Sequence, residues 1–167
     1  MRAAMPPVDE VQLLPDPQQH TVLAATLERV NRASNSARAA ALQRNTFEGP
    51  ALRELVKDEV ARAKLPDGLV RPITDRVAAS LARRAGKQPK FTTYQSLTMP
   101  ASAFKWGGSD RVTMLTAAGR RTISVRVDRS RGDLRPPLAG RPATLVYRNA
   151  EFELLAADVD RTPADDE

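Results

Sequence analysis

Basic and aromatic residues gather in one part of the chain, and these residue types are suited to holding nucleic acid. Between residues 90 and 111 the two types are interleaved, as Lys90, Phe91, Tyr94, Phe104, Lys105, Trp106 and Arg111. Aromatic rings stack on unpaired bases, and cationic side chains hold the phosphate backbone. The rings can instead belong to the core, because aromatic residues make up only 4% of the chain. The charges are therefore the stronger part of this signal.

The charge is distributed unevenly along the sequence. Over residues 83–148, fourteen Lys and Arg residues stand against three Asp and Glu, a net charge of +11. The whole chain of 167 residues carries +6, so the rest of it is acidic. A basic block of this kind neutralises phosphates and releases their counterions. The alternative is a basic α+β scaffold or interaction protein that binds acidic protein partners, and it stays open at this point.

Signatures of catalysis are scarce. The chain has no cysteine, which excludes disulfides, thiol nucleophiles and Cys-based zinc sites. Its one histidine, His20, has no partner at metal-ligand spacing, so an ordinary exposed or core-edge role is favoured. No Walker A loop, G-x-G-x-x-G or G-x-S-x-G sequence occurs. The acidic C-terminal run is more typical of a solvated charge run than of a two-metal site. We therefore expect no enzyme activity, no metal and no cofactor.

Hydrophobic periodicity predicts a helical part followed by a strand part. After a short strand at 11–14, three helices are expected, over about 17–43, 50–64 and 67–84. Later residues follow strand patterning, with 92–99 extended and hairpin strands at 111–116, 121–127, 143–147 and 152–157. We expect an α+β fold in which a bundle of about three helices precedes a region of antiparallel strands.

These elements predict the organisation of the chain. Disorder is expected at both ends, a first strand comes next, and a helical and a β region follow, with boundaries at 1–10, 11–16, 17–86, 87–160 and 161–167. No apolar run approaches the ~20 residues needed to cross a membrane. The N-terminus lacks the apolar core of a signal peptide. We expect a soluble cytoplasmic protein, bacterial and nucleoid-associated if it binds DNA.

Six short sequences follow one another in a characteristic order. They are L-P-D-P-Q-Q (14–19), N-R-A-S-N-S-A (31–37), L-P-D-G-L-V-R-P-I-T-D-R-V (65–77), F-T-T-Y-Q-S-L (91–97), A-A-G-R-R (117–121) and L-V-Y-R-N-A-E-F-E-L-L-A (145–156). This series resembles the N-terminal half of TnpB proteins, transposon-encoded RNA-guided nucleases related to type V CRISPR effectors. The resemblance covers roughly residues 11–160, and the last hairpin is its most specific element.

The resemblance implies that the β region is an antiparallel, β-barrel-like wedge of OB type. Together with a helical recognition region, this wedge grips guide RNA and reads a short DNA motif beside the target. Residues that it assigns to motif reading are Phe47, Asp67, Gly68, Arg71, Tyr94, Gln95 and Ser96. Arg71 can reach a base edge, and a helix start offers N–H groups to phosphate. A core role for Phe47, and a simple cap and turn for Asp67 and Gly68, are the alternatives.

The basic residues of the second half are predicted to hold RNA or other phosphates. They are Lys87, Lys90, Lys105, Arg111, Arg120, Arg121 and Arg126. The resemblance places the family's RuvC nuclease carboxylates and Cys-rich zinc element after residue 167, so it assigns no catalytic or metal residue here. The partners that it implies are guide RNA, double-stranded DNA and a separate RuvC-bearing chain. The oligomeric state is left open.

Overall fold

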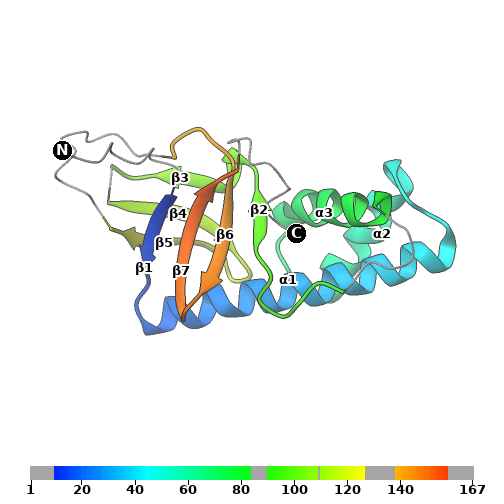
Figure 1. The fold of residues 1–167 in the computed structure, drawn as a ribbon, viewed down its shortest axis with the longest axis horizontal. Helices are drawn as coiled ribbons and strands as arrows, with labels where there is room; N and C mark the ends of the chain where they lie inside the picture. Colours follow the sequence, from blue (N-terminus) through cyan, green and yellow to red (C-terminus); the bar gives the residue numbers. More distant parts are fainter. Residues whose placement is uncertain (1–9, 84–89, 109, 127–137, 158–167) are drawn as a thin grey trace, which may run out of the picture.

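Three helices and seven strands make up the described parts of the chain, residues 10–83, 90–108, 110–126 and 138–157 of the computed structural model (Figure 1). The helices are α1 (Pro17–Arg44), α2 (Gly49–Arg62) and α3 (Val70–Ala82), with 3₁₀ turns η1 (Asp67–Leu69) and η2 (Ala101–Ala103). The strands are β1 (Glu10–Leu14), β2 (Leu97–Met99), β3 (Phe104–Trp106), β4 (Arg111–Thr116), β5 (Gly119–Val125), β6 (Ala143–Arg148) and β7 (Glu151–Ala156). This confirms a mixed α+β fold.

The strands form one antiparallel sheet in the order β2-β6-β7-β1-β5-β4-β3. Its two edge strands, β2 and β3, are joined only by η2, so Met99 and Phe104 lie at most about 18 Å apart along the chain. A flat seven-stranded sheet would hold its edges about 29 Å apart, at roughly 4.8 Å for each neighbouring pair. The sheet therefore curls, as Figure 1 shows. No ladder within the described residues joins β2 to β3, so the expected barrel is not closed.

One face of the sheet is filled by its own apolar side chains. Several cross-strand pairs on this face have both of their side chains buried, as in Leu13–Val125, Val112–Ile123 and Leu145–Leu154. Each pair follows the period of two that a half-buried strand requires. The short β1 is the middle strand of the sheet, because it pairs with both β5 and β7. The first strand is thus an integral part of the β region.

Helix α1 connects the sheet to the other two helices. It begins as expected at Pro17, where Asp16 and Gln19 form a reciprocal capping box. Near its start, the Gln19 amide donates to the Thr122 carbonyl oxygen, and Thr26 Oγ1 accepts from the Ala117 N–H at 2.8 Å. Its second half packs against α2 and α3 (Figure 1). Buried side chains of both regions form one continuous core.

Some predicted boundaries are wrong. The segment expected to be extended from residue 92 is a turn up to 96, and only Leu97–Met99 is a strand. The three-residue β3 was not predicted, because it is too short to show a period. Glu10 belongs to β1, and the other residues of the predicted disordered ends lie outside the described ranges. Within those ranges, no helix has the length and apolar character that a membrane span requires.

Candidate nucleic-acid interface

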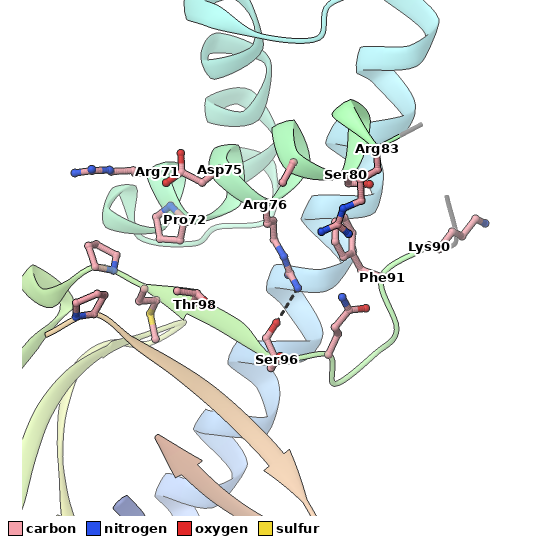
Figure 2. A pocket seen from close by; sticks show the side chains of 15 residues that line it. Arg71, Pro72, Asp75, Arg76, Ser80, Arg83, Lys90, Phe91, Ser96 and Thr98 are labelled. Atoms are coloured by element: carbon pink, nitrogen blue, oxygen red, sulfur yellow. Dashed lines mark hydrogen bonds between the residues drawn. The ribbon is translucent and has the colours of Figure 1, made fainter. Parts of the chain in front are cut away.

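A cavity of about 550 Å³ lies between α3 and the segment that runs from Lys90 into β2. Four cations line it: Arg71, Arg76 and Arg83 from the helix side, and Lys90 from the segment. Figure 2 shows Arg76 between one end with Pro72 and Thr98 and another with Arg83, Phe91 and Lys90. The volume falls within the range of small-molecule sites in proteins, roughly 300–1,000 Å³.

Arg76 is the most constrained of these cations. Its guanidinium donates to Asn31 Oδ1 at 2.6 Å and to the Ser96 carbonyl oxygen at 2.8 Å. The guanidinium carbon also lies 4.3 Å from the centre of the Phe91 ring, a cation–π contact. Contacts from α1, the 90–96 segment and the ring therefore fix the position of this charge before any ligand arrives.

The 90–96 segment is anchored by two asparagines of α1. Asn35 forms a reciprocal pair with the backbone of Phe91, accepting from its N–H at 2.8 Å and donating to its carbonyl oxygen at 2.9 Å. Asn31 Nδ2 donates to the carbonyl oxygens of Thr93 and Gln95, both at 3.0 Å. Because the segment has no regular secondary structure from 90 to 96, these side chains satisfy backbone groups that a ladder would otherwise satisfy.

The charge of Arg76 has no carboxylate partner among the described residues. Asp75 lines the same cavity, but Figure 2 shows it pointing away from Arg76. Burial lowers the pKa of Arg76 to about 10, which leaves the guanidinium charged at neutral pH. Removing a charge from water without a counterion costs free energy. The cavity wall is therefore electrostatically prepared for an anion.

A second set of cations lies on the outer face of the sheet. Lys105 pairs with Thr113 across β3 and β4, and Thr113 Oγ1 lies 2.6 Å from Thr122 Oγ1 across β4 and β5. Since alternate residues share a face, this register places on it the cations Lys105, Arg111, Arg120 and Arg126. Arg121 pairs with Met114 and has the opposite parity, so it does not belong to this set.

The outer-face cations differ in how they are held. Arg120 donates to the carbonyl oxygens of Ser102 and Ala103, which ties η2 to β5. The other three are exposed, and their side chains form no hydrogen bond or ion pair within the described part of the chain. This outer basic face, defined by Lys105, Arg111, Arg120 and Arg126, is thus a solvated surface with little fixed geometry.

The structure brings together four of the predicted site residues. Arg71, Gln95 and Ser96 from the motif-reading set and Lys90 from the phosphate set all line the cavity. Gln95 Oε1 accepts from the Thr92 N–H at 2.9 Å, which leaves its amide N–H groups as donors. The sequence prediction therefore contained part of this site without showing that its members meet.

The other predicted motif readers lie elsewhere. Phe47 is 46% exposed in the loop between α1 and α2, so it is not a core residue. Asp67 and Gly68 form η1, where a Cβ on Gly68 would stand 2.7 Å from Leu115 Cδ2. Packing against Leu115 therefore explains a glycine at position 68 without a bound ligand. Tyr94 packs against Tyr147, with ring centres 5.3 Å apart. Lys87 lies outside the described residues.

Two of the four cations that line the cavity, Arg76 and Arg83, were not among the predicted residues. Arg76 falls on the stripe of α3 that also carries Ile73, Val77 and Ser80, all buried. An arginine on such a buried stripe needs hydrogen-bond partners inside the protein. In the sequence, Asn31 and Asn35 on the matching side of α1 were the signal for such partners. Polar residues at helix positions where the period requires apolar ones could have identified this hydrogen-bond network.

Other features of the described residues bear on function. His20 Nε2 lies 3.2 Å from the Ala150 carbonyl oxygen, and its ring meets the edge of Phe152, so it has a packing role. Within the described ranges, no cluster of three or more His, Asp or Glu side chains is placed to hold a metal ion. Neither models of known protein families nor curated proteins match this sequence.

Proposed function

We propose that this chain is a nucleic-acid-binding module that holds phosphates in the cavity beside α3. The observation that carries the proposal is the half-buried guanidinium of Arg76, fixed by three hydrogen bonds and a ring contact and without a carboxylate partner among the described residues. Phosphate oxygens match the planar donor fork of arginine. Arg71, Arg83 and Lys90 supply further positive charge around the same cavity.

The outer basic face has a supporting role in this proposal. Its exposed cations raise the potential around the β3–β5 side of the sheet and attract a polyanion over a distance. They act mainly on the rate of encounter, because solvent and salt screen exposed charges within about 10 Å. The cavity then provides the contacts of fixed geometry.

The finer proposal is a TnpB-like role, in which the chain grips guide RNA and contributes to reading a short target-adjacent DNA motif, with nuclease activity on a separate RuvC-bearing chain. The ordered series of short sequences supports it. The curled antiparallel sheet, next to three helices, is also compatible with an OB-like wedge beside a recognition region. Sequencing the nucleic acid that copurifies from the native host tests this role: one enriched structured RNA supports it, and random RNA contradicts it.

The broader function is tested by fluorescence anisotropy with labelled RNA and DNA at several salt concentrations. We expect binding that weakens steeply between about 50 and 200 mM salt. The double variant Arg83→Gln/Lys90→Gln should lower the slope of log affinity against log salt by about 2, one for each phosphate contact. The matched control is Arg53→Gln/Lys57→Gln, which removes two exposed cations from α2 outside the cavity.

Two outcomes would contradict the proposal. One is the absence of binding to any nucleic acid at low salt. The other is saturable binding to acidic protein, such as polyglutamate, together with only weak binding to nucleic acid. The second outcome would favour the basic scaffold that the charge distribution also allows.

A further inference from the structure

Resting on the proposed function, we propose that the cavity beside α3 receives one unpaired nucleotide, so that the module prefers single strands to duplexes. The positive charge of the site does not by itself distinguish single-stranded from double-stranded nucleic acid. Three features of the described residues carry the inference: the concave shape, the separation of a proline-lined end from an end with Arg83, Lys90 and Phe91, and the rigid wall between them.

The shape of the site favours a ligand that protrudes. Proteins read a duplex by placing a helix or a strand pair into a groove, which requires a convex element. Here the four cations surround a hollow of about 550 Å³ instead. A base that has left its stack is a protruding group, and proteins that take such bases hold them in pockets. A continuous duplex could contact only those cations that lie at the opening of the cavity.

The lining of the cavity matches the two parts of a nucleotide. At one end lie Pro72, Met99, Pro100 and Pro142, and the last three are neighbours because Met99 pairs with Ala143. Met99 and Pro72 are buried, so the apolar surface that this end offers to a base comes from Pro100 and Pro142. Arg71 and Asp75 lie beside Pro72 at the same end (Figure 2). At the other end lie Arg83, Lys90 and Phe91 (Figure 2), where cations can hold a phosphate. Gln95 adds amide N–H donors, which make no hydrogen bond within the described residues and can meet a base edge.

The wall between the two ends is preorganised. Arg76 stacks on Phe91 and is hydrogen-bonded to α1 and to the Ser96 carbonyl oxygen. The guanidinium therefore needs little further ordering when a phosphate or a base arrives, which lowers the entropic cost of binding. A rigid platform of this type holds an unpaired nucleotide without requiring a particular sequence.

The experiment compares a labelled single strand of about 12 nucleotides with the duplex of the same sequence, since single-strand sites span about 4–16 nucleotides. Anisotropy at fixed salt should give the wild-type chain at least about tenfold higher affinity for the single strand, a difference of about 1.4 kcal/mol. Strands of RNA and of DNA are both used, which separates the two sources of an unpaired nucleotide. This comparison needs no variant.

A pair of tryptophan substitutions locates the effect. Ala79 is exposed on α3 and lines the cavity, so Ala79→Trp should fill the hollow without removing a charge. We expect it to lower single-strand affinity by about tenfold and to leave duplex affinity unchanged. Ala82→Trp is the matched control, because Ala82 is exposed at the end of the same helix and outside the lining. Thermal melts verify that both variants fold.

The outcomes separate the inference from the proposed function. Equal affinity for single strand and duplex in the wild-type chain would overturn the inference while the module still binds nucleic acid. An unchanged single-strand affinity in a folded Ala79→Trp chain would overturn it too. Failure of the wild-type chain to bind either form at low salt would instead overturn the proposed function. A single-strand preference lost only in Ala79→Trp supports the inference.

Discussion

The cavity beside α3 and the outer basic face of the sheet each carry four cations, yet they present them differently. The cavity contributes Arg71, Arg76, Arg83 and Lys90, and the face contributes Lys105, Arg111, Arg120 and Arg126. On the face, three of the four side chains are exposed and make no hydrogen bond or ion pair within the described residues, and only Arg120 is held. In the cavity, one guanidinium is held by α1, a ring and a carbonyl oxygen.

The comparison teaches that equal charge does not give equal recognition. Exposed ion pairs contribute little net free energy, because solvation and side-chain entropy offset the Coulomb attraction. Folding has already partly removed water from the cation in the cavity and fixed its position. Binding therefore does not incur the costs in solvation and side-chain entropy a second time. We therefore assign specificity to the cavity and long-range attraction to the sheet.

The largest effect is expected from Arg76→Gln. Truncation leaves Asn31 Oδ1 and the Ser96 carbonyl oxygen without their donor and removes the contact with Phe91. We expect a loss of about 1–3 kcal/mol in the free energy of unfolding, because the buried Asn31 Oδ1 loses its donor, whereas the exposed Ser96 carbonyl oxygen can be hydrated. Urea unfolding measures it. The control Arg71→Gln, on an exposed side chain of the same helix, should stay within about 0.5 kcal/mol. Equal effects would remove the distinction between fixed and exposed cations.

A smaller effect is expected from Asn35→Ala, which releases the backbone of Phe91 from α1. Two hydrogen bonds are lost from a partly buried site, so the free energy of unfolding should fall by about 1–2 kcal/mol. Because the segment also forms a cavity wall, affinity for nucleic acid should fall with it. Ser36→Ala, an exposed change one residue further along α1, is the control. A stable Asn35→Ala chain with wild-type affinity would contradict the proposed anchoring.

The outer basic face is tested by Lys105→Gln/Arg111→Gln/Arg126→Gln, which removes its three exposed cations. We expect slower association at low salt, by about tenfold, and a small change in affinity at physiological salt. Stopped-flow anisotropy separates the two rates. A larger loss of affinity at physiological salt in this triple variant than in Arg83→Gln/Lys90→Gln would contradict the assignment of the fixed contacts to the cavity.

The smallest effect is expected from Phe47→Ala. The side chain is 46% exposed at the tip between α1 and α2 and does not line the cavity. We expect a change within about 0.5 kcal/mol in the free energy of unfolding, and wild-type affinity for nucleic acid. A large loss of affinity without loss of stability would show that Phe47 contacts the ligand, as the family resemblance implies.

Sequence patterns predicted the regular elements well and the site only in part. The β4 strand was predicted to the residue, because its alternation is unbroken and the Ala117-Ala118 turn follows directly. Charge pointed to Lys90 but equally to Lys105 and Arg111, since sequence does not separate a cavity from an open face, and Arg71 was assigned only by the family resemblance. What distinguishes them is tertiary: Arg76 meets Asn31 across 45 positions of sequence. No periodicity encodes such a contact.

The curl of the sheet was also outside the reach of local patterns. Pairing of β1 with both β5 and β7 joins the start of the chain to strands more than 100 residues later. Alternation along β4 and β5 fixed the inner and outer faces, and hence placed Thr113 and Thr122 together. The order of the strands, which brings β2 under α3 and so completes the cavity, comes only from the full set of ladders.

The central claim is that the cavity, and not the open face, makes the fixed contacts with nucleic acid. The most direct test follows the arginine side-chain N–H signals by ¹H–¹⁵N NMR while a single strand of about 12 nucleotides is added. We predict large shifts for Arg76 and Arg83 and small, salt-sensitive shifts for Arg111 and Arg126. Large shifts confined to Arg111 and Arg126, with Arg76 unchanged at saturation, would contradict the claim.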